Sequence, residues 1–238
     1  MNVKLISYSQ VNVFAFDSDS GDDYVTYPKT AQDLVAFCAR VSNPSNQYNT
    51  QTSERLIQYL IQHKHWSPME MVSMCLEIET TRDIARQFLR HRSFSFQEFS
   101  QRYADPVHEL SFVIRDARLQ DKENRQNSID VPPETKDENG HDLAITWQQH
   151  QENIISYAKA VYEYAIRNGI AKEQARVVLP EGLMASRLYV NGTLRSWLHY
   201  VEVRSAKGTQ KEHIEIAKAC ANVISKIFPM ITNFVEKN

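Results

Sequence analysis

The chain has 238 residues, of which 42% are hydrophobic and 24% are charged, and its net charge is -2. This length can bury one full core, so we expect a single domain spanning residues 1–238. No stretch approaches the ~18 apolar residues that cross a bilayer, and the first residues lack the apolar run of a secretory signal. We therefore expect a cytoplasmic protein. Three widely spaced cysteines predict neither a disulfide framework nor a structural zinc site.

The first third of the chain contains signals for both strands and helices. Residues 11–16 are predicted to form a strand. A helix is expected after Thr30, because Thr30 and Asp33 have the spacing of a capping box. Its apolar face is expected to carry Leu34, Phe37, Cys38 and Val41. A second helix is expected over residues 53–63, and a half-buried strand over residues 71–79. The strand alternation rests on Val72, Met74, Leu76 and Ile78.

The second half of the chain is predicted to be mostly helical. Residues 104–150 are polar and irregular, and residues 131–142 are the best candidate for a mobile surface loop. A long helix follows and ends at Gly169. Its buried face is expected to carry Ile154, Ala158, Val161 and Ala165. Two more helices are predicted over residues 194–204 and 209–228. We expect an α+β fold with a central, mostly antiparallel sheet flanked by helices.

An arginine stripe follows the strand over residues 71–79. Thr80 and Asp83 have capping-box spacing and predict a helix that runs to about residue 90. On this helix, arginines recur at every fourth position, with Gln87 beside them: Arg82, Arg86 and Arg90. Most such stripes form a solvated surface face. Here residues 82–102 contain five arginines and no lysine in a chain of slightly negative net charge, which indicates a small anionic ligand.

The segment after this helix has the residue types of a nucleotide site. In an extended chain, Glu98, Ser100 and Arg102 would lie on the same side. An arginine fork can bind a phosphate or the oxygen edge of a pyrimidine, while a hydroxyl and a carboxylate add directional hydrogen bonds. The interleaved phenylalanines, Phe94, Phe96 and Phe99, are more typical of a core than of a base-stacking platform.

Several motifs resemble those of the flavin-dependent thymidylate synthases, over most of the chain from about Ala39. The signature is Arg90-His91-Arg92, seven residues, Ser100, one residue and Arg102. Further similar elements are His65-x-Ser67-Pro68-x-Glu70, Ala175-Arg176-Val177-Val178-Leu179-Pro180, and Arg195-Ser196-Trp197-Leu198-His199 followed by Arg204 and Gln210-x-Glu212.

The resemblance implies the residues of two binding sites. Deoxyuridine monophosphate (dUMP) would be bound by Gln87, Arg90, Glu98, Phe99, Ser100, Gln101, Arg102, Arg176 and Arg204. FAD would be bound by Ser42, Ser67, Arg90, His91, Arg92, Glu98, Thr193, Arg195 and His199. His65 would lie near the folate. These sites would be shared between the subunits of a homotetramer, which would explain why no glycine-rich nucleotide loop is visible.

The implied reaction is the reductive methylation of dUMP to dTMP. 5,10-Methylenetetrahydrofolate would supply the carbon, and FAD reduced by NADPH would supply hydride. Arg204 would act as the catalytic residue, because a permanent cation can stabilise negative charge that develops on the uracil ring. No side chain is expected to attack the substrate, since the cysteines lie in patterns typical of small buried hydrophobic residues.

Two other functions are compatible with parts of the sequence. His63, His65 and His91, with Glu70, could supply ligands for a metal-dependent hydrolase. The arginine stripe with interleaved aromatic residues could belong to a non-catalytic nucleic-acid-binding protein. The slight negative charge disfavours the second, and the weak histidine spacing disfavours the first. We therefore expect no bound metal and no nucleic-acid partner.

Overall fold

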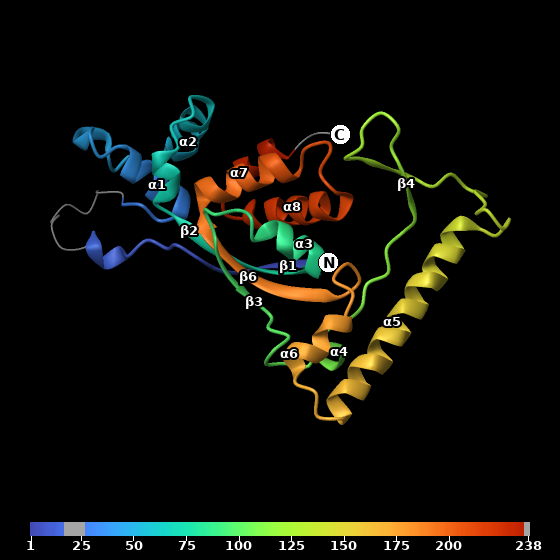
Figure 1. Ribbon diagram of the computed structural model, residues 1–238. Coiled ribbons are helices and arrows are strands. Elements are labelled where there is room, and N and C mark those ends of the chain that lie inside the picture. Colours follow the sequence, from blue (N-terminus) through green and yellow to red (C-terminus); the bar gives the residue numbers. More distant parts are fainter. Residues whose placement is uncertain (17–26, 236–238) are drawn as a thin grey trace.

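A four-stranded antiparallel sheet forms the centre of the fold (Figure 1). The computed structural model describes residues 1–16 and 27–235. The strand order is β1, β2, β6, β3, and every neighbouring pair is antiparallel. The four strands are Asn2–Tyr8, Ser73–Thr81, Ala185–Thr193 and Ser95–Glu98, in that order. The expected α+β class with an antiparallel sheet is confirmed.

The C-terminal helices α7 (Leu194–Arg204) and α8 (Lys211–Ile224) cover one face of this sheet (Figure 1). Alternate residues of the two central strands point into the core and are at most 1% exposed: Met74, Leu76, Ile78, Leu188 and Val190. Burial of each such side chain stabilises the fold by roughly 1.5–3 kcal/mol. The predicted strand alternation and the predicted C-terminal helices are therefore confirmed.

Three shorter helices pack around the sheet: α1 (Ala31–Ala39), α2 (Ser53–Gln62) and α3 (Arg82–Phe88). The capping box of α1 is confirmed, because the Thr30 hydroxyl accepts from the Asp33 N–H at 3.1 Å and the Asp33 carboxylate accepts from the Thr30 N–H at 3.1 Å. The buried face of α1 differs from the predicted one. It carries Ala31, Val35 and Ala36.

The strand predicted over residues 11–16 is wrong. Residues Val13–Ala15 form a 3-10 turn, and Phe14 is 80% exposed. The edge strand is β1 instead, which pairs with β2 from Asn2 opposite Glu79. Residues 2–8 and residues 11–16 are both short segments with similar strand propensity. Pairing with β2 decides that the first of them forms the strand.

Strand β6 was not predicted, although it lies in the centre of the sheet. Its buried positions are Ser186, Leu188, Val190 and Gly192. A serine and a glycine at inward positions weaken the apolar alternation by which a strand is recognised.

Helix α3 differs from its predicted start and end. Its N-cap is Thr81 and not Thr80, and the Thr81 hydroxyl donates to the Asp83 carboxylate at 2.6 Å instead of capping the helix. The helix ends at Phe88, two residues before the predicted end. Arg90 therefore lies in the turn that follows.

The middle segment is less irregular than expected. It contains α4 (Pro106–Glu109) and the hairpin strands β4 (Arg118–Gln120) and β5 (Ser128–Asp130). Helix α5 (Leu143–Arg167) begins before residue 150, because the Asp142 carboxylate caps it by accepting from the Ile145 N–H at 3.1 Å. Residues 136 and 142 form a β-bridge at the base of the candidate loop. The mobility of residues 131–142 stays a prediction.

Helix α5 extends along the outside of the fold, away from the sheet (Figure 1). With α6 (Lys172–Ala175) it forms a second apolar cluster of Tyr162, Ala165, Ala175, Leu179 and Met184. Ile154, expected on the buried face, is 51% exposed. No helix within the described ranges is both long and apolar enough to cross a bilayer. The single-domain organisation stays a prediction.

Four further 3-10 turns complete the described chain. They are Pro44–Asn46, Ser67–Glu70, Arg176–Val178 and Pro229–Phe234. The second and third matter for the site below, because they carry two of the motifs.

Gly192 allows close packing between β6 and the ring of Phe94. A Cβ atom on Gly192 would lie 2.3 Å from Cδ1 of that ring. We expect Gly192→Ala to lower the free energy of unfolding by about 1–3 kcal/mol through overpacking. Urea unfolding would measure this, with Gly182→Ala as the matched control, since a Cβ there meets no atom within 4 Å. Equal stability of the two variants would contradict the packing argument.

Candidate active site

The centre of the candidate site is a hydrogen bond between Arg204 and His91. Arg204 lies at the end of α7, and His91 lies in the turn after α3. The Arg204 Nε–H donates to His91 Nε2 at 2.9 Å. This hydrogen bond therefore connects the Arg90-His91-Arg92 motif to the C-terminal motif that contains Arg204.

His91 is a neutral acceptor in this pair. Burial, together with the positive charges of Arg204, His199 and Arg90, lowers the pKa of His91 to about 4. At neutral pH the imidazole carries its proton on Nδ1, because Nε2 accepts from Arg204. Arg204 thus keeps its two terminal nitrogens for other partners while its Nε is fixed.

The arginine stripe divides into a paired part and an unpaired part. Arg82 and Arg86 contact the Glu98 carboxylate at 3.4 and 3.3 Å, and Ser186 donates to it at 2.9 Å. Within the described residues, no carboxylate lies at ion-pair distance from four other arginines: Arg90, Arg92, Arg176 and Arg204. Of the three arginines in the stripe, Arg90 alone therefore has no carboxylate partner among the described residues.

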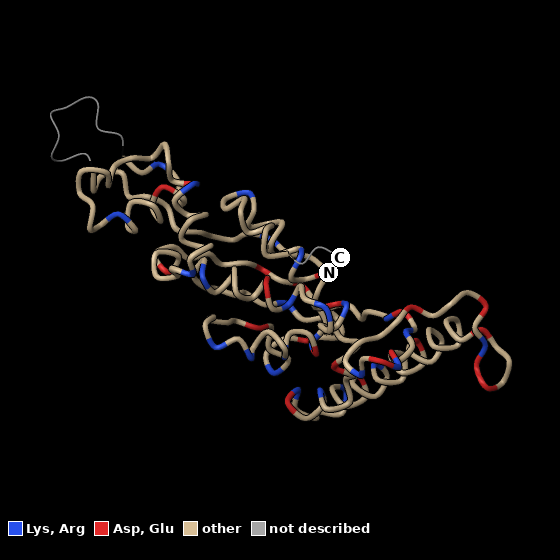
Figure 2. Tube along the Cα trace, turned by 90° about the horizontal axis from the view of Figure 1, so that it is seen from above, with Lys and Arg blue, Asp and Glu red and all other residues tan. Residues whose placement is uncertain are grey.

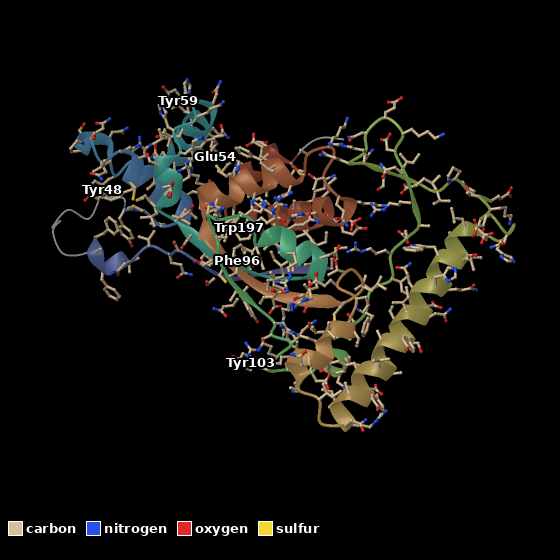
Figure 3. All side chains as sticks on the ribbon, viewed as in Figure 1. Tyr48, Glu54, Tyr59, Phe96, Tyr103 and Trp197 are labelled. Carbon is tan, nitrogen blue, oxygen red and sulfur yellow. The ribbon has the colours of Figure 1, made fainter. Side chains whose placement is uncertain are left out.

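The extended arrangement expected through Arg102 is wrong. Strand β3 ends at Glu98, and the Ala104 N–H donates to the Ser100 carbonyl at 3.1 Å, which closes a turn. Arg102 points to Glu173, with an N–O distance of 3.3 Å. Figure 3 shows Tyr103, the next residue, far from Trp197 and close to α6.

Other predicted nucleotide residues lie around this turn. The Phe99 N–H donates to the Arg187 carbonyl at 2.9 Å, and Gln101 is buried, with its amide 3.3 Å from the sulfur of Met184. Arg176 is half-buried at the start of a 3-10 turn. The roles of these side chains toward a nucleotide stay predictions.

A cleft of about 680 Å³ lies at the N-terminus of α7. Its lining includes three predicted FAD residues, Thr193, Arg195 and His199, and is completed by Lys64, Trp66, Glu70, Ser93, Ser196 and Glu202. Arg195 forms an ion pair with Glu70. The predicted residue Ser67 lies in the same 3-10 turn as Glu70. A polar cleft at a helix N-terminus suits a ligand with phosphate groups.

Not every predicted residue reaches this cleft. Ser42 lines a separate hollow of about 530 Å³ beside α1 and α2, together with Arg55 and Tyr59. Tyr59 stacks on His63 with ring centroids 4.0 Å apart, and His65 lies beside them with its centroid 6.1 Å from that of His63.

The two alternative functions gain no support from the geometry. In the part of the chain that the structure describes, no three His, Cys, Asp or Glu side chains gather into a metal-binding group. His63 and His91 serve different local contacts. Figure 2 shows acidic and basic residues interleaved along most of the trace, which does not favour a nucleic-acid-binding face.

Tyr200 and His213 contact predicted site residues, His91 and Gln87, although the motifs do not assign them a role. His213 lies on the apolar face of α8 with Ala217, Cys220 and Ile224, and it is 0% exposed. It contacts Gln87 and the Tyr200 hydroxyl at 2.9 and 3.1 Å. A polar residue at an inward position of a helix is the signal that could have identified it.

Both buried histidines predict a pH-dependent stability. Burial, followed by the charge of Arg204, lowers the pKa of His213 to about 3, and that of His91 is about 4. Between these values and about 6.5 the unfolded chain binds more protons, so stability must fall as the pH falls. We expect the melting temperature to drop by several degrees from about pH 7 to about pH 5. His213→Asn should flatten this dependence, and an unchanged slope would contradict the assignment.

Comparison with known proteins identifies the family. The family model described as thymidylate synthase complementing protein matches residues 24–230. A probable flavin-dependent thymidylate synthase of Paramecium bursaria Chlorella virus 1 is 46% identical over 87% of this chain and 91% of its own, and a flavin-dependent thymidylate synthase of Synechocystis is 45% identical over 88% and 91%. The fold resembles the UMP/dUMP methylase PolB of Streptomyces cacaoi, with a TM-score of 0.74, 22% identity and coverage of 98% and 93%. The chain belongs to the thymidylate synthase complementing protein family, the flavin-dependent thymidylate synthases.

Proposed function

We propose that this protein converts dUMP to dTMP, with 5,10-methylenetetrahydrofolate as the carbon donor and FAD, reduced by NADPH, as the source of hydride. The observation that carries the proposal is Arg204, which is fixed by neutral His91 and lies near the charge of Arg90, with no ion pair to either arginine in the described chain. A permanent cation held in a fixed orientation can stabilise the negative charge that develops on the pyrimidine ring during the reaction. Membership of the family supplies the reaction class.

The nucleotide would bind along the end of α3 and the turn after β3. We assign the contacts to Gln87, Arg90, Glu98, Phe99, Ser100, Gln101, Arg102, Arg176 and Arg204. The guanidinium groups without a carboxylate partner would bind the phosphate, since one guanidinium group can donate to two phosphate oxygens at once. Glu98 is held by Arg82 and Arg86, which fixes its carboxylate for a hydroxyl of the ligand.

Arg204 is the residue that we assign to catalysis. Carbon–carbon bond formation at C5 of uracil requires electron density that spreads onto O2, N3 and O4. The two terminal nitrogens of Arg204 can donate to that edge while Nε stays bound to His91. This interaction strengthens as charge develops, so it favours the transition state over the bound substrate.

The cleft at the start of α7 fits a flavin dinucleotide. It combines a helix N-terminus, the cation of Arg195 and the ring of Trp66. We assign FAD to Ser67, Arg90, His91, Arg92, Glu98, Thr193, Arg195 and His199, with Ser42 in the neighbouring hollow and His65 near the folate. When bound, FAD would supply the hydride.

The cysteines have the properties of structural residues rather than nucleophiles. Cys220 is fully buried, and burial raises the pKa of all three thiols, Cys38 and Cys75 included. A nucleophilic thiol needs a lowered pKa. These observations support a reaction in which no side chain bonds to the substrate.

The exposed apolar residues support a homotetramer with shared sites. Helix α5 exposes Ile154, Tyr157 and Tyr164 at 51%, 75% and 60%. Side chains of this kind on one helix favour packing against another chain. We propose that copies of this chain complete the sites and that the protein works in the cytoplasm.

We expect Arg204→Lys to lower the turnover number about a hundredfold with a much smaller change in dUMP affinity. Lysine keeps the charge but has neither the planar fork nor an Nε–H for His91. Steady-state formation of dTMP from dUMP, methylenetetrahydrofolate and NADPH would measure this. Arg125→Lys, at an exposed position between β4 and β5, is the control for the same exchange. An unchanged turnover number in Arg204→Lys would remove Arg204 from catalysis.

A cysteine-free variant, with Cys38, Cys75 and Cys220 replaced by alanine, should still form dTMP if it folds and holds FAD. Separately, Ser100→Ala should retain measurable activity, because its hydroxyl is assigned to hydrogen bonding only. The readout is dTMP formed per bound flavin. A flavin-loaded but inactive variant of either kind would show that a side-chain nucleophile is required.

Light scattering of the 27.6 kDa chain should give the mass of about four subunits. Tyr157→Lys on the exposed face of α5 should shift the protein to smaller species and reduce activity together. Lys159→Glu on the same helix serves as a charge control. A fully active monomer would contradict the shared-site assignment.

A further inference from the structure

His213 is a buried histidine outside the assigned contacts. It is 0% exposed, and each ring nitrogen has one partner. Nδ1 lies 2.9 Å from the Gln87 side-chain oxygen, and Nε2 lies 3.1 Å from the Tyr200 hydroxyl. The ring also packs against Phe88, with centroids 5.2 Å apart. A fully satisfied polar group inside an apolar core fixes the orientation of its partners.

The hydrogen-bond chain continues from Gln87 to Gln210, two residues before Glu212, which is part of a buried ion pair. The Gln87 amide nitrogen donates to the Gln210 side-chain oxygen at 2.9 Å. Beyond it, Glu212 is paired with Arg118. Burial raises the pKa of Glu212, but the hydrogen bond from Arg118 and the charge of Arg118 lower it overall. Glu212 is therefore a carboxylate that can only accept.

The orientation of Gln87 sets the direction of the chain. Its amide nitrogen donates to the Gln210 side-chain oxygen, so its own side-chain oxygen faces His213. The oxygen of Gln87 must then accept from the His213 Nδ1–H. His213 Nε2 carries no proton and accepts from the Tyr200 hydroxyl. The contacts of Gln87, His213 and Tyr200 therefore have one consistent assignment of donors and acceptors.

We infer that His213 is a positioning residue for nucleotide binding: it holds the Gln87 carbonyl, so that Gln87 offers the nucleotide an N–H donor. This inference rests on the proposed function. Gln87 uses one N–H on Gln210, and its second N–H has no partner within the described chain. The Arg90 N–H donates to the Gln87 backbone carbonyl at 3.4 Å, so both side chains belong to one turn. A donor beside a guanidinium selects an oxygen of the ligand, on the phosphate or the ring.

A matched pair of variants separates orientation from packing. His213→Asn places an amide nitrogen near Nδ1 and keeps the donor to Gln87. His213→Gln places its amide near Nε2, so it keeps the contact with Tyr200 and loses the one with Gln87. Both remove the ring and should lower the melting temperature alike. Titration of dUMP into the flavin-loaded protein would give the dissociation constant, and the flavin content would serve as the check on the fold.

We expect His213→Gln to weaken dUMP binding about five- to tenfold, the value of one net hydrogen bond. His213→Asn should stay within about twofold of the unchanged protein. Equal dUMP affinity of the two variants, whether normal or reduced, would overturn the inference, because packing alone would then explain His213. Absence of dTMP formation by the unchanged protein would count against the proposed function only, since the binding comparison does not depend on turnover.

A second pair covers the case in which neither His213 variant folds. Gln210→Met removes the acceptor that fixes Gln87 from the other side and should weaken dUMP binding by a similar factor. Lys211→Met, at the adjacent and more exposed position, should not. Equal affinity of these two variants would likewise overturn the inference.

Discussion

The arrangement of the site depends on the hydrogen bond from Arg204 to His91. It forms only while the imidazole is neutral, because a protonated ring would repel the guanidinium. Burial and the surrounding cations maintain that state. One contact thereby fixes the orientation of an arginine, the tautomer of a histidine and the distance between two segments far apart in the sequence. Arg204 and the nearby Arg90 have no carboxylate partner in the described chain, which favours an anionic ligand.

The aromatic core explains why this contact can be held. Phe88 of α3 stacks on Tyr200 of α7 with centroids 4.6 Å apart, and Phe94 packs against Trp197 at the same distance. Trp197 in turn donates to the Met74 carbonyl on β2 at 3.3 Å. The sheet, the turn that carries His91 and the helix that carries Arg204 therefore form one packed unit. In Figure 3, Trp197 and Phe96 lie within this unit.

Sequence patterns predicted the strand β2, the capped helix α1 and helices α2, α7 and α8, because each has a local signal of period or capping. They failed where tertiary contacts decide. The edge strand formed at β1, where β2 provides a partner, and β6 was hidden by Ser186 and Gly192 at inward positions. The resemblance assigned His91 and Arg204 to the site, and this assignment stays a prediction. The sequence could not show that His91 and Arg204 contact each other, nor that His213 contacts Gln87 and Tyr200, because such pairings arise only when α3, α7 and α8 pack together.

The most direct test of the account is a crystal structure of the flavin-loaded protein with dUMP. We predict that the terminal nitrogens of Arg204 donate to the oxygen edge of the uracil ring while its Nε still donates to His91. A structure in which dUMP binds away from Arg204, or in which Arg204 turns from His91 to pair with a carboxylate, would contradict the account.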